Sequence, residues 1–371
     1  TRLDAAVRIG EEPDHPLYAG GFSAPELAFP GIVTDQADVY TLGAMLHRAL
    51  SGRELPEEGI QTAELPAAIP IPGVPQLLSR ALAPAEERLS LEDFYRGLLR
   101  LKDQRAAPPL SLEVASATTL GLNPTRLVNE DAGGYAIWSV MGAQGSEQRA
   151  LLCVADGMGG MDAGEVASQT ALSTIMEGAA QLLTSPNVSP PDPIDLIRQA
   201  APAVHAAADG RQTGTTVTCT VMEHGELTLG HVGDTRAYLF RSGELKRLTQ
   251  DHSLVAAMVA SGVLSAADAQ GHPDSNKVLR SLGGHRELPP GYVDSLEQTL
   301  GQPRLKLEAS DWLLLCSDGV WGSVADDDIR TVLSEAMSSG HAAEALIQRA
   351  LSAGAPDNAT AIVGRVMSLP A

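Results

Sequence analysis

The sequence predicts an α+β protein in which antiparallel β-sheet carries helices on its outer faces, preceded by a smaller, mainly helical segment. Three observations indicate this fold class. Apolar residues recur at helical spacing over residues 1–102. Beyond residue 113, short strand-like runs bounded by Gly, Asp or Ser predominate. Several of these runs follow one another directly instead of alternating strictly with helices, which favours antiparallel pairing.

The N-terminal segment contains three stretches with helix-like periodicity, at 37–50, 74–82 and 89–102. Ser90 and Asp93 stand at the start of the third stretch in the arrangement of a helix N-cap. Residues 103–112 follow, and the two prolines at 108 and 109 disfavour regular structure there. We therefore expect a domain at 1–102, a linker at 103–112 and a second domain at 113–371.

The second domain is expected to contain both strands and helices. Strands are predicted at 149–155, 215–222, 227–233, 236–243, 311–317 and 359–366, and helices at 163–183, 195–208, 254–262 and 342–351. A further strand-like segment begins near residue 131, and the proline-rich stretch 184–193 is expected to be an exposed loop.

Composition excludes several classes of function. The net charge of −20 over 371 residues disfavours binding to nucleic acid or to an anionic membrane surface. No window approaches 18 apolar residues, and no secretory signal is visible. Cys153, Cys219 and Cys316 each lie in an apolar run, and their odd number argues against a disulfide framework. We therefore expect a cytoplasmic protein with buried, inert thiols.

Carboxylates recur at the ends of the predicted strands. They are Asp156 after "LLCVA", Asp234 after "LTLGHVG", Asp318 after "WLLLCS", Asp357 before "NATAIVGRV", and the pair Glu130 and Asp131 at the start of another strand-like segment. One such aspartate is explained as a turn former, but four of them, each flanked by Gly or Asn, indicate a gathered cluster. Clustered carboxylates repel one another and are costly to bury unless cations compensate them. Oxygen donors without a zinc-like Cys/His spacing indicate magnesium or manganese.

The stretch "VADGMGGMDAGEVAS" (154–168) places glycines directly after the first of these aspartates. We expect a buried strand to end on Asp156 and Gly157 to turn its backbone carbonyl toward an ion. The remaining glycines would let the chain turn tightly before a helix, with Asp162 and Glu165 as an N-terminal capping pair.

Eight motifs occur in a fixed order: "RLVNED", "ADGMGGMDAGEVAS", "GTTVTCTVM", "LGHVGDTRAYLF", "LTQDHS", "SLGG", "LLLCSDGVWGSV" and "PDNATAIV". Together, over about residues 115–368, they resemble the signature of the metal-dependent type 2C protein phosphatases, most closely the bacterial branch. The resemblance implies a β-sandwich of two antiparallel sheets flanked by helices, with a binuclear manganese or magnesium centre at one end. It also implies hydrolysis of phosphoserine and phosphothreonine in protein substrates by a metal-activated water.

The resemblance assigns ligands residue by residue. It implies that Asp156, Asp318 and Asp357 hold one ion. Asp156 would also bind a second ion, together with the Gly157 carbonyl and Glu130.

Further roles follow from the same motifs. Asp131 would orient waters or the neighbouring glutamate, and Asp234 with Asp318 resembles a weaker third site, so that two ions or three are expected. Arg126 is expected to hold the substrate phosphate, because a guanidinium offers two parallel donors to a phosphate dianion. Met158 stands where relatives from eukaryotes have a candidate acid histidine, and methionine cannot donate a proton.

The N-terminal domain carries a second resemblance. The stretches "GFSAPELAFPG" (21–31), "TDQADVYTLGAMLHRALSGRELP" (34–56) and "LLSRALAPAEERLSLEDF" (77–94) resemble the C-terminal lobe of a Ser/Thr protein kinase. This implies that Glu26 pairs with Arg88 and that Asp38 begins a buried central helix. The glycine-rich loop, strand lysine and catalytic-loop aspartate are missing, so we expect a non-catalytic, scaffolding or regulatory segment.

Three functions are therefore compared. The first is a cytoplasmic phosphatase that reverses the action of a cognate kinase. The second is a non-catalytic pseudokinase–phosphatase scaffold, which the complete set of ligand aspartates disfavours. The third is the C-terminal part of a bifunctional kinase–phosphatase, with a kinase N-lobe before Thr1.

Overall fold

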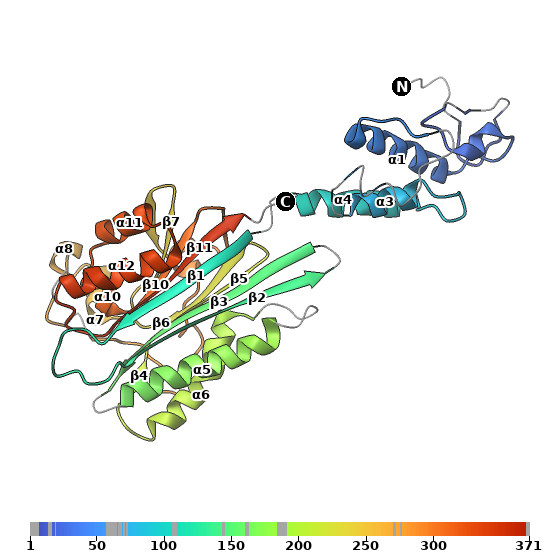
Figure 1. Ribbon diagram of the computed structural model, residues 1–371. Helices are drawn as coiled ribbons and strands as arrows, with labels where there is room; N and C mark the ends of the chain where they lie inside the picture. The colour runs from blue at the N-terminus through green and yellow to red at the C-terminus, as the bar shows by residue number, and fades with distance from the viewer. Residues whose placement is uncertain are drawn as a thin grey trace. The chain divides into compact units, whose positions relative to one another are not determined.

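The computed structural model, shown in Figure 1, divides the chain into two compact units. One comprises Thr1–Ala107 and Ala143–Gly145, the other Pro108–Gly142 and Ser146–Ala371. The structure describes residues 7–13, 17–18, 20–56, 65, 69, 71, 73–105, 110–142, 145–159, 163–183, 191–269, 272–274 and 277–368.

The first unit is helical, as predicted. Its described elements are η2 (Pro25–Ala28), α1 (Asp35–Ser51), α3 (Val74–Ala81) and α4 (Leu91–Arg105). Ser90 caps the start of α4: its hydroxyl accepts from the Asp93 amide at 3.1 Å and donates to the Asp93 carboxylate at 2.9 Å. This confirms the predicted N-cap, whereas α4 extends to residue 105 and so into the range expected to be linker.

The predicted pair of Glu26 and Arg88 is present. The Arg88 guanidinium donates to both oxygens of Glu26, at 2.5 and 3.1 Å, and its side chain is almost fully buried. The expected start of α1 is wrong, because the helix begins at Asp35 rather than Asp38. One face of α1 is buried, whereas Leu42 on another face is 42% exposed.

The second unit contains two β-sheets (Figure 1). The first has the order β1 (Leu110–Thr119), β11 (Ala359–Ser368), β10 (Trp312–Cys316), β7 (Arg236–Arg241) and β8 (Glu244–Arg247). The second has the order β2 (Asp131–Gly142), β3 (Gly145–Met158), β5 (Val217–Glu223), β6 (Glu226–Val232) and β9 (Leu305–Lys306), and β4 (Gly214–Thr215) pairs with the end of β3. All four pairings of the first sheet are antiparallel, as are β3–β5, β5–β6 and β6–β9 in the second.

Helices cover the outer face of each sheet. The second sheet carries α5 (Ala163–Leu183) and α6 (Pro193–Ala208), and the first carries α11 (Asp326–Glu335) and α12 (Ser339–Ser352). The shorter helices are α7 (Leu254–Ala260), α8 (Ala266–Ala269), α9 (Glu297–Leu300) and α10 (Asp318–Trp321). The second unit is thus a sandwich of helix, sheet, sheet and helix layers, and the predicted fold class is confirmed for it.

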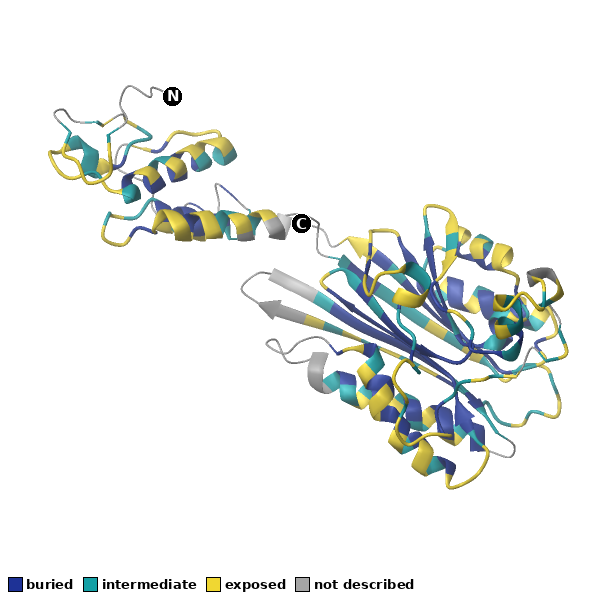
Figure 2. Cartoon of the chain, turned by 180° about the vertical axis from the view of Figure 1, so that it is seen from behind, coloured by how far each residue is buried: buried dark blue, intermediate teal, exposed yellow. Residues whose placement is uncertain are grey.

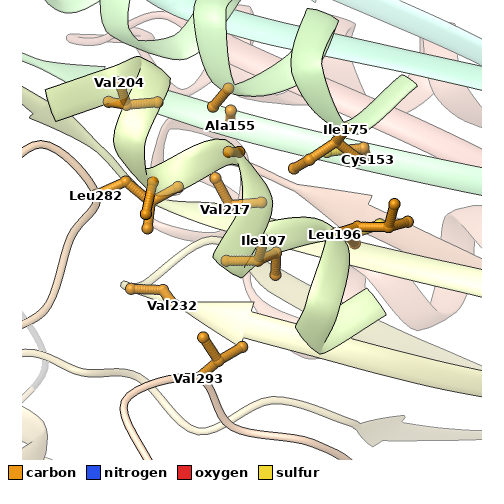
Figure 3. Packing of buried hydrophobic residues seen from close by; sticks show 14 of the residues in the cluster. Cys153, Ala155, Ile175, Leu196, Ile197, Val204, Val217, Val232, Leu282 and Val293 are labelled. Carbon is orange, nitrogen blue, oxygen red and sulfur yellow. The ribbon is translucent and has the colours of Figure 1, made fainter. Parts of the chain in front are cut away.

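Successive side chains of each strand point to opposite faces of the sheet, and this alternation produces the layers of the sandwich. On β3, Leu152 and Val154 pack into the cluster between the sheets, whereas Cys153 and Ala155 pack into the cluster under the helices. Figure 3 shows the cluster under the helices, in which Ile197 of α6 points toward the sheet. Both strand faces are therefore buried, as the dark blue sheet interior in Figure 2 shows. All three cysteines are buried free thiols, as expected.

Several elements differ from the sequence prediction. Strand β1 begins at residue 110, inside the expected linker, because its ten residues pair with β11. Strand β8 and helix α11 were not predicted. The prolines at 108 and 109, Asp162, and residues 184–190 of the expected loop lie outside the described residues. In the part of the chain that the structure describes, no helix is long and apolar enough to cross a membrane.

Each unit has its own apolar clusters, so we expect the second unit to fold without the first. The fragment Pro108–Ala371 should unfold cooperatively, with a Tm within about 3 °C of the value for the same unit in the full chain. Circular dichroism and calorimetry check this. An insoluble fragment, or one without a cooperative transition, would show that the two units depend on one another for folding.

Candidate active site

The register of the first sheet gathers three aspartates at one end of the sandwich. Cys316, the last residue of β10, lies opposite the first residue of β7 on one side and Ala361 of β11 on the other. The segments after β10, before β7 and before β11 therefore meet. These segments carry Asp318, Asp234 and Asp357, respectively.

The second sheet contributes two more carboxylates to the same end. The backbone of Asp156 in β3 is fixed to Thr216: its amide donates to the threonine hydroxyl at 3.2 Å, and its carbonyl accepts from the threonine amide at 2.9 Å. Asp131, the first residue of β2, accepts a hydrogen bond of 2.6 Å from the hydroxyl of Ser317. Because Ser317 directly precedes Asp318, this bond links the start of β2 to the chain segment that carries the Asp318 carboxylate.

The expectation that the strand ends on Asp156 is wrong. The strand does not end on Asp156, because Gly157 and Met158 continue β3 by pairing with β4. A Cβ atom at Gly157 would overlap the carbonyl groups of Gly164 and Glu130, and the Gly157 amide donates to the Glu130 carbonyl at 3.1 Å. Close backbone approach therefore requires glycine at this position.

The carboxylates of this end are close enough to perturb one another. Burial raises the pKa of Asp156 and that of Asp318 well above the usual range. Repulsion from Asp318 raises the pKa of Asp156 further. Repulsion from Asp234, Asp357 and Asp131 raises the pKa of Asp318, and a hydrogen bond with Asp156 partly offsets that rise. Asp131, Asp234 and Asp357 add to the repulsion that raises the pKa of Asp156. Burial raises the pKa of Asp131 to about 6 and that of Asp234 to about 7. The structure thus brings the five predicted aspartates into one electrostatic cluster.

Arg126 lies at the edge of this cluster. Its guanidinium donates to Asp357 at 2.5 Å and approaches Glu130 at 3.5 Å, and about one third of its side chain is exposed. Burial raises the pKa of Asp357, and the positive charge of Arg126 partly offsets that rise. Arg126 therefore combines access to solvent with a fixed position beside the predicted ligands.

Two residues that the sequence prediction missed hold the site together. The side-chain carbonyl of Asn358 accepts from the Glu130 amide at 2.9 Å, and its side-chain amide donates to the Leu120 carbonyl at 3.0 Å. Ser317, besides its bond to Asp131, accepts from the Thr360 amide at 3.0 Å. Their only signal in the sequence is that each stands next to a ligand aspartate.

The donor set suits a hard divalent cation. Carboxylate oxygens crowded in a buried site repel one another, and Mg²⁺ or Mn²⁺ with oxygen ligands removes that cost. Within the described residues, no group of three or more His, Cys, Asp or Glu side chains is arranged to hold a metal ion as it stands. Two of the predicted ligands, Glu130 and Asp357, contact the guanidinium of Arg126 instead.

The comparisons with known proteins agree with this arrangement of residues. Residues 126–353, more than half of the chain, match the family model "Protein phosphatase 2C". The chain belongs to the protein phosphatase 2C family.

Curated relatives come from several bacteria. A serine/threonine phosphatase, stp, from Listeria welshimeri is 31% identical over 241 residues, which cover 63% of this chain and 89% of that protein. The serine/threonine protein phosphatase PstP from Mycobacterium tuberculosis is 35% identical over 228 residues, which cover 58% of this chain and 40% of PstP.

Solved structures show the same fold. The crystal structure of the M. tuberculosis phosphatase PstP matches with a TM-score of 0.55 and 32% identity, over 68% of this chain and 98% of that chain. The catalytic domain of PstP in complex with two manganese ions matches with a TM-score of 0.55 and 30% identity, over 70% of this chain and 99% of that chain. The chain is a metal-dependent serine/threonine protein phosphatase.

Metal binding should depend on pH with a definite sign. Folding raises the pKa of four aspartates, Asp131, Asp156, Asp234 and Asp318. The stability that their protonated forms contribute is therefore lost as the pH rises through those pKa values. Manganese requires the deprotonated carboxylates and should restore that loss. The increase in Tm caused by a fixed excess of Mn²⁺ should grow between pH 5.5 and 7.5, by about 3 to 5 °C per pH unit for each proton released.

Differential scanning calorimetry with Mn²⁺ and with EDTA at each pH measures this increase. The Tm with EDTA is subtracted from the Tm with Mn²⁺ because burial lowers the pKa of His231 to about 3. That shift gives the stability of the metal-free protein an additional pH dependence of opposite sign. An increase in Tm that is independent of pH would contradict the carboxylate cluster as the metal site.

Proposed function

We propose that this phosphatase hydrolyses phosphoserine and phosphothreonine in proteins at the carboxylate cluster around Asp156 and Asp318. One observation carries the proposal: buried carboxylates from both sheets converge at one end of the sandwich and raise the pKa of these two aspartates. Such a site is unfavourable without cations. An arginine able to bind phosphate, Arg126, lies at its edge.

The residues that would hold the ions come from five segments of the chain. Asp156, Asp318 and Asp357 would hold one Mn or Mg ion, and Asp156, Glu130 and the Gly157 carbonyl the second. Asp234 with Asp318 would hold a third, weaker one. When bound, the ions lower the pKa of a water and neutralise charge on the phosphoryl group. The neighbouring structure with two manganese ions supports at least two sites.

The remaining residues would position substrate and ligands. Arg126 presents a planar guanidinium that can donate to two phosphate oxygens at once and stabilise the charge of the transition state. Asp131 would orient waters or Glu130, and its hydrogen bond from Ser317 would also help to keep Asp318 in place. Met158 cannot protonate the leaving group, so that proton would come from water.

For the N-terminal unit we propose a non-catalytic, kinase C-lobe-like segment at 1–102, joined through 103–112 to the phosphatase domain at 113–371. The ion pair between Glu26 and the buried Arg88 supports the likeness to a kinase lobe. A scaffolding or regulatory role, with a cognate kinase as partner, fits a segment without catalytic motifs. The buried free thiols support a cytoplasmic location. A bifunctional kinase–phosphatase with a kinase N-lobe before Thr1 is the alternative.

Two substitutions separate the proposed roles. Asp318→Asn should lower kcat by about a hundredfold or more, since it removes a charge from the proposed ligands of the reactive centre. Arg126→Ala should act mainly on KM, raising it by roughly tenfold or more, because it removes a charged hydrogen-bonding partner of the phosphate. Steady-state hydrolysis of p-nitrophenyl phosphate and of a phosphothreonine peptide with Mn²⁺ measures both constants.

The surface pair of Asp327 and Arg330 on α11, with 3.0 Å between them, provides matched controls. Asp327→Asn and Arg330→Ala should leave kcat and KM as in the parent. If Asp318→Asn turns over like the parent, or if full activity persists in metal-free protein, the carboxylate cluster is not the active site. The scaffold function would gain support if the parent hydrolysed neither substrate.

A further inference from the structure

Trp321 connects the two chain segments that carry Asp318 and Asp234. Helix α10 begins with Asp318 and ends with Trp321, and residues three apart lie on one face of a helix. The indole Nε1 of Trp321 donates a hydrogen bond of 2.9 Å to the backbone carbonyl of Asp234, in the turn between β6 and β7. The Trp321 side chain therefore joins α10, which carries Asp318, to the turn that carries Asp234.

The indole ring is itself fixed in orientation. The guanidinium carbon of Arg236 lies 3.5 Å from the centroid of the Trp321 ring, in a cation–π contact. Arg236 is held in turn by Asp251, which accepts from its Nε at 3.1 Å and from a terminal nitrogen at 2.7 Å. Because such a bidentate pair restricts the guanidinium plane, the ring beneath it cannot turn freely. The direction of the indole N–H is thereby set.

The other side of the turn is attached to a different segment. The Gly233 amide donates to His252 Nδ1 at 3.1 Å, and the His252 amide donates to the Gly233 carbonyl at 2.7 Å. These bonds fix the start of the turn relative to residues 251–252, and the pairing of Arg236 with Cys316 fixes its end relative to β10. The hydrogen bond from Trp321 attaches the turn itself to α10, beside the carboxylate of Asp234, a residue that is only 3% exposed.

Helix α10 is a firm support for this attachment. A Cβ atom at Gly319 would overlap the carbonyl of Asn358, so the helix packs directly on the backbone that follows Asp357. Motion of Asp234 relative to Asp318 would therefore have to occur on the side of the turn, where the indole hydrogen bond opposes it.

We propose that Trp321 is a positioning residue that fixes Asp234 relative to Asp318 and thereby sets the affinity of the metal site that these two carboxylates share. This inference rests on the proposed function, because it takes both carboxylates as metal ligands. Trp321 acts through the backbone of Asp234, whose carbonyl accepts from the indole N–H.

Trp321→Phe tests the proposal, because phenylalanine keeps a ring beneath Arg236 but has no N–H donor. Trp312→Phe is the matched control: Trp312 also lies beneath an arginine, Arg365 at 5.1 Å, but at the opposite end of β10 from Asp318. Isothermal titration of each full-length protein with Mn²⁺ is compared with that of Asp234→Asn, which identifies the binding step to which this carboxylate contributes.

In Trp321→Phe we expect the Kd of that step to rise roughly three- to tenfold, the factor contributed by one hydrogen bond, with the other Mn²⁺ steps unchanged. The metal-free Tm should match that of Trp312→Phe, and a higher Mn²⁺ concentration should restore the parental kcat. Unchanged titration of Trp321→Phe, equal weakening in Trp312→Phe, or uniform weakening of all steps with a lower metal-free Tm would overturn the proposal. A parent protein that binds no Mn²⁺ would overturn the proposed metal centre as well.

Discussion

Repulsion between buried carboxylates is the constraint on which the functional end of the molecule depends. Asp156 and Asp318 come from different sheets, and the pKa of each is raised by burial and by repulsion from neighbouring aspartates. Separated in water, two carboxylates ionise independently, but here burial and proximity penalise their charged forms. Such an arrangement lowers the stability of the metal-free fold at neutral pH. The buried carboxylates become favourable when divalent cations or the guanidinium of Arg126 supply positive charge. The stability of this end of the molecule therefore depends on the same cations that its function requires.

The rest of the second unit resists that repulsion. Apolar clusters between and outside the sheets fix the strands, and the sheet register fixes where each strand ends. Close backbone contacts then leave little freedom at the strand ends: Gly157 packs against Glu130, and Gly319 packs against Asn358. The carboxylates are therefore carried by segments that cannot relax apart, and a preorganised charged site results.

Much of this arrangement could be predicted from the sequence. Strands such as 311–317 are continuous apolar runs bounded by polar residues, and aspartates at their ends fall together once the strands pair. Strand β1 was missed because it follows directly on two prolines and its second half, ASATT, contains only small and polar side chains. Its pairing with β11 joins Leu110 to Ser368 across most of the chain. The contacts of Arg126 with Asp357 and of Trp321 with Asp234 were also missed, because long-range side-chain pairs leave no local pattern.

The central claim is that the strand-end carboxylates form the metal centre. The most direct test is an anomalous difference map from crystals of the protein with Mn²⁺, recorded near the manganese absorption edge. The account predicts one peak bordered by carboxylate oxygens of Asp156, Asp318 and Asp357, and a second beside Glu130 and the Gly157 carbonyl. Manganese bound elsewhere, with no peak within ligand distance of Asp156, would contradict it.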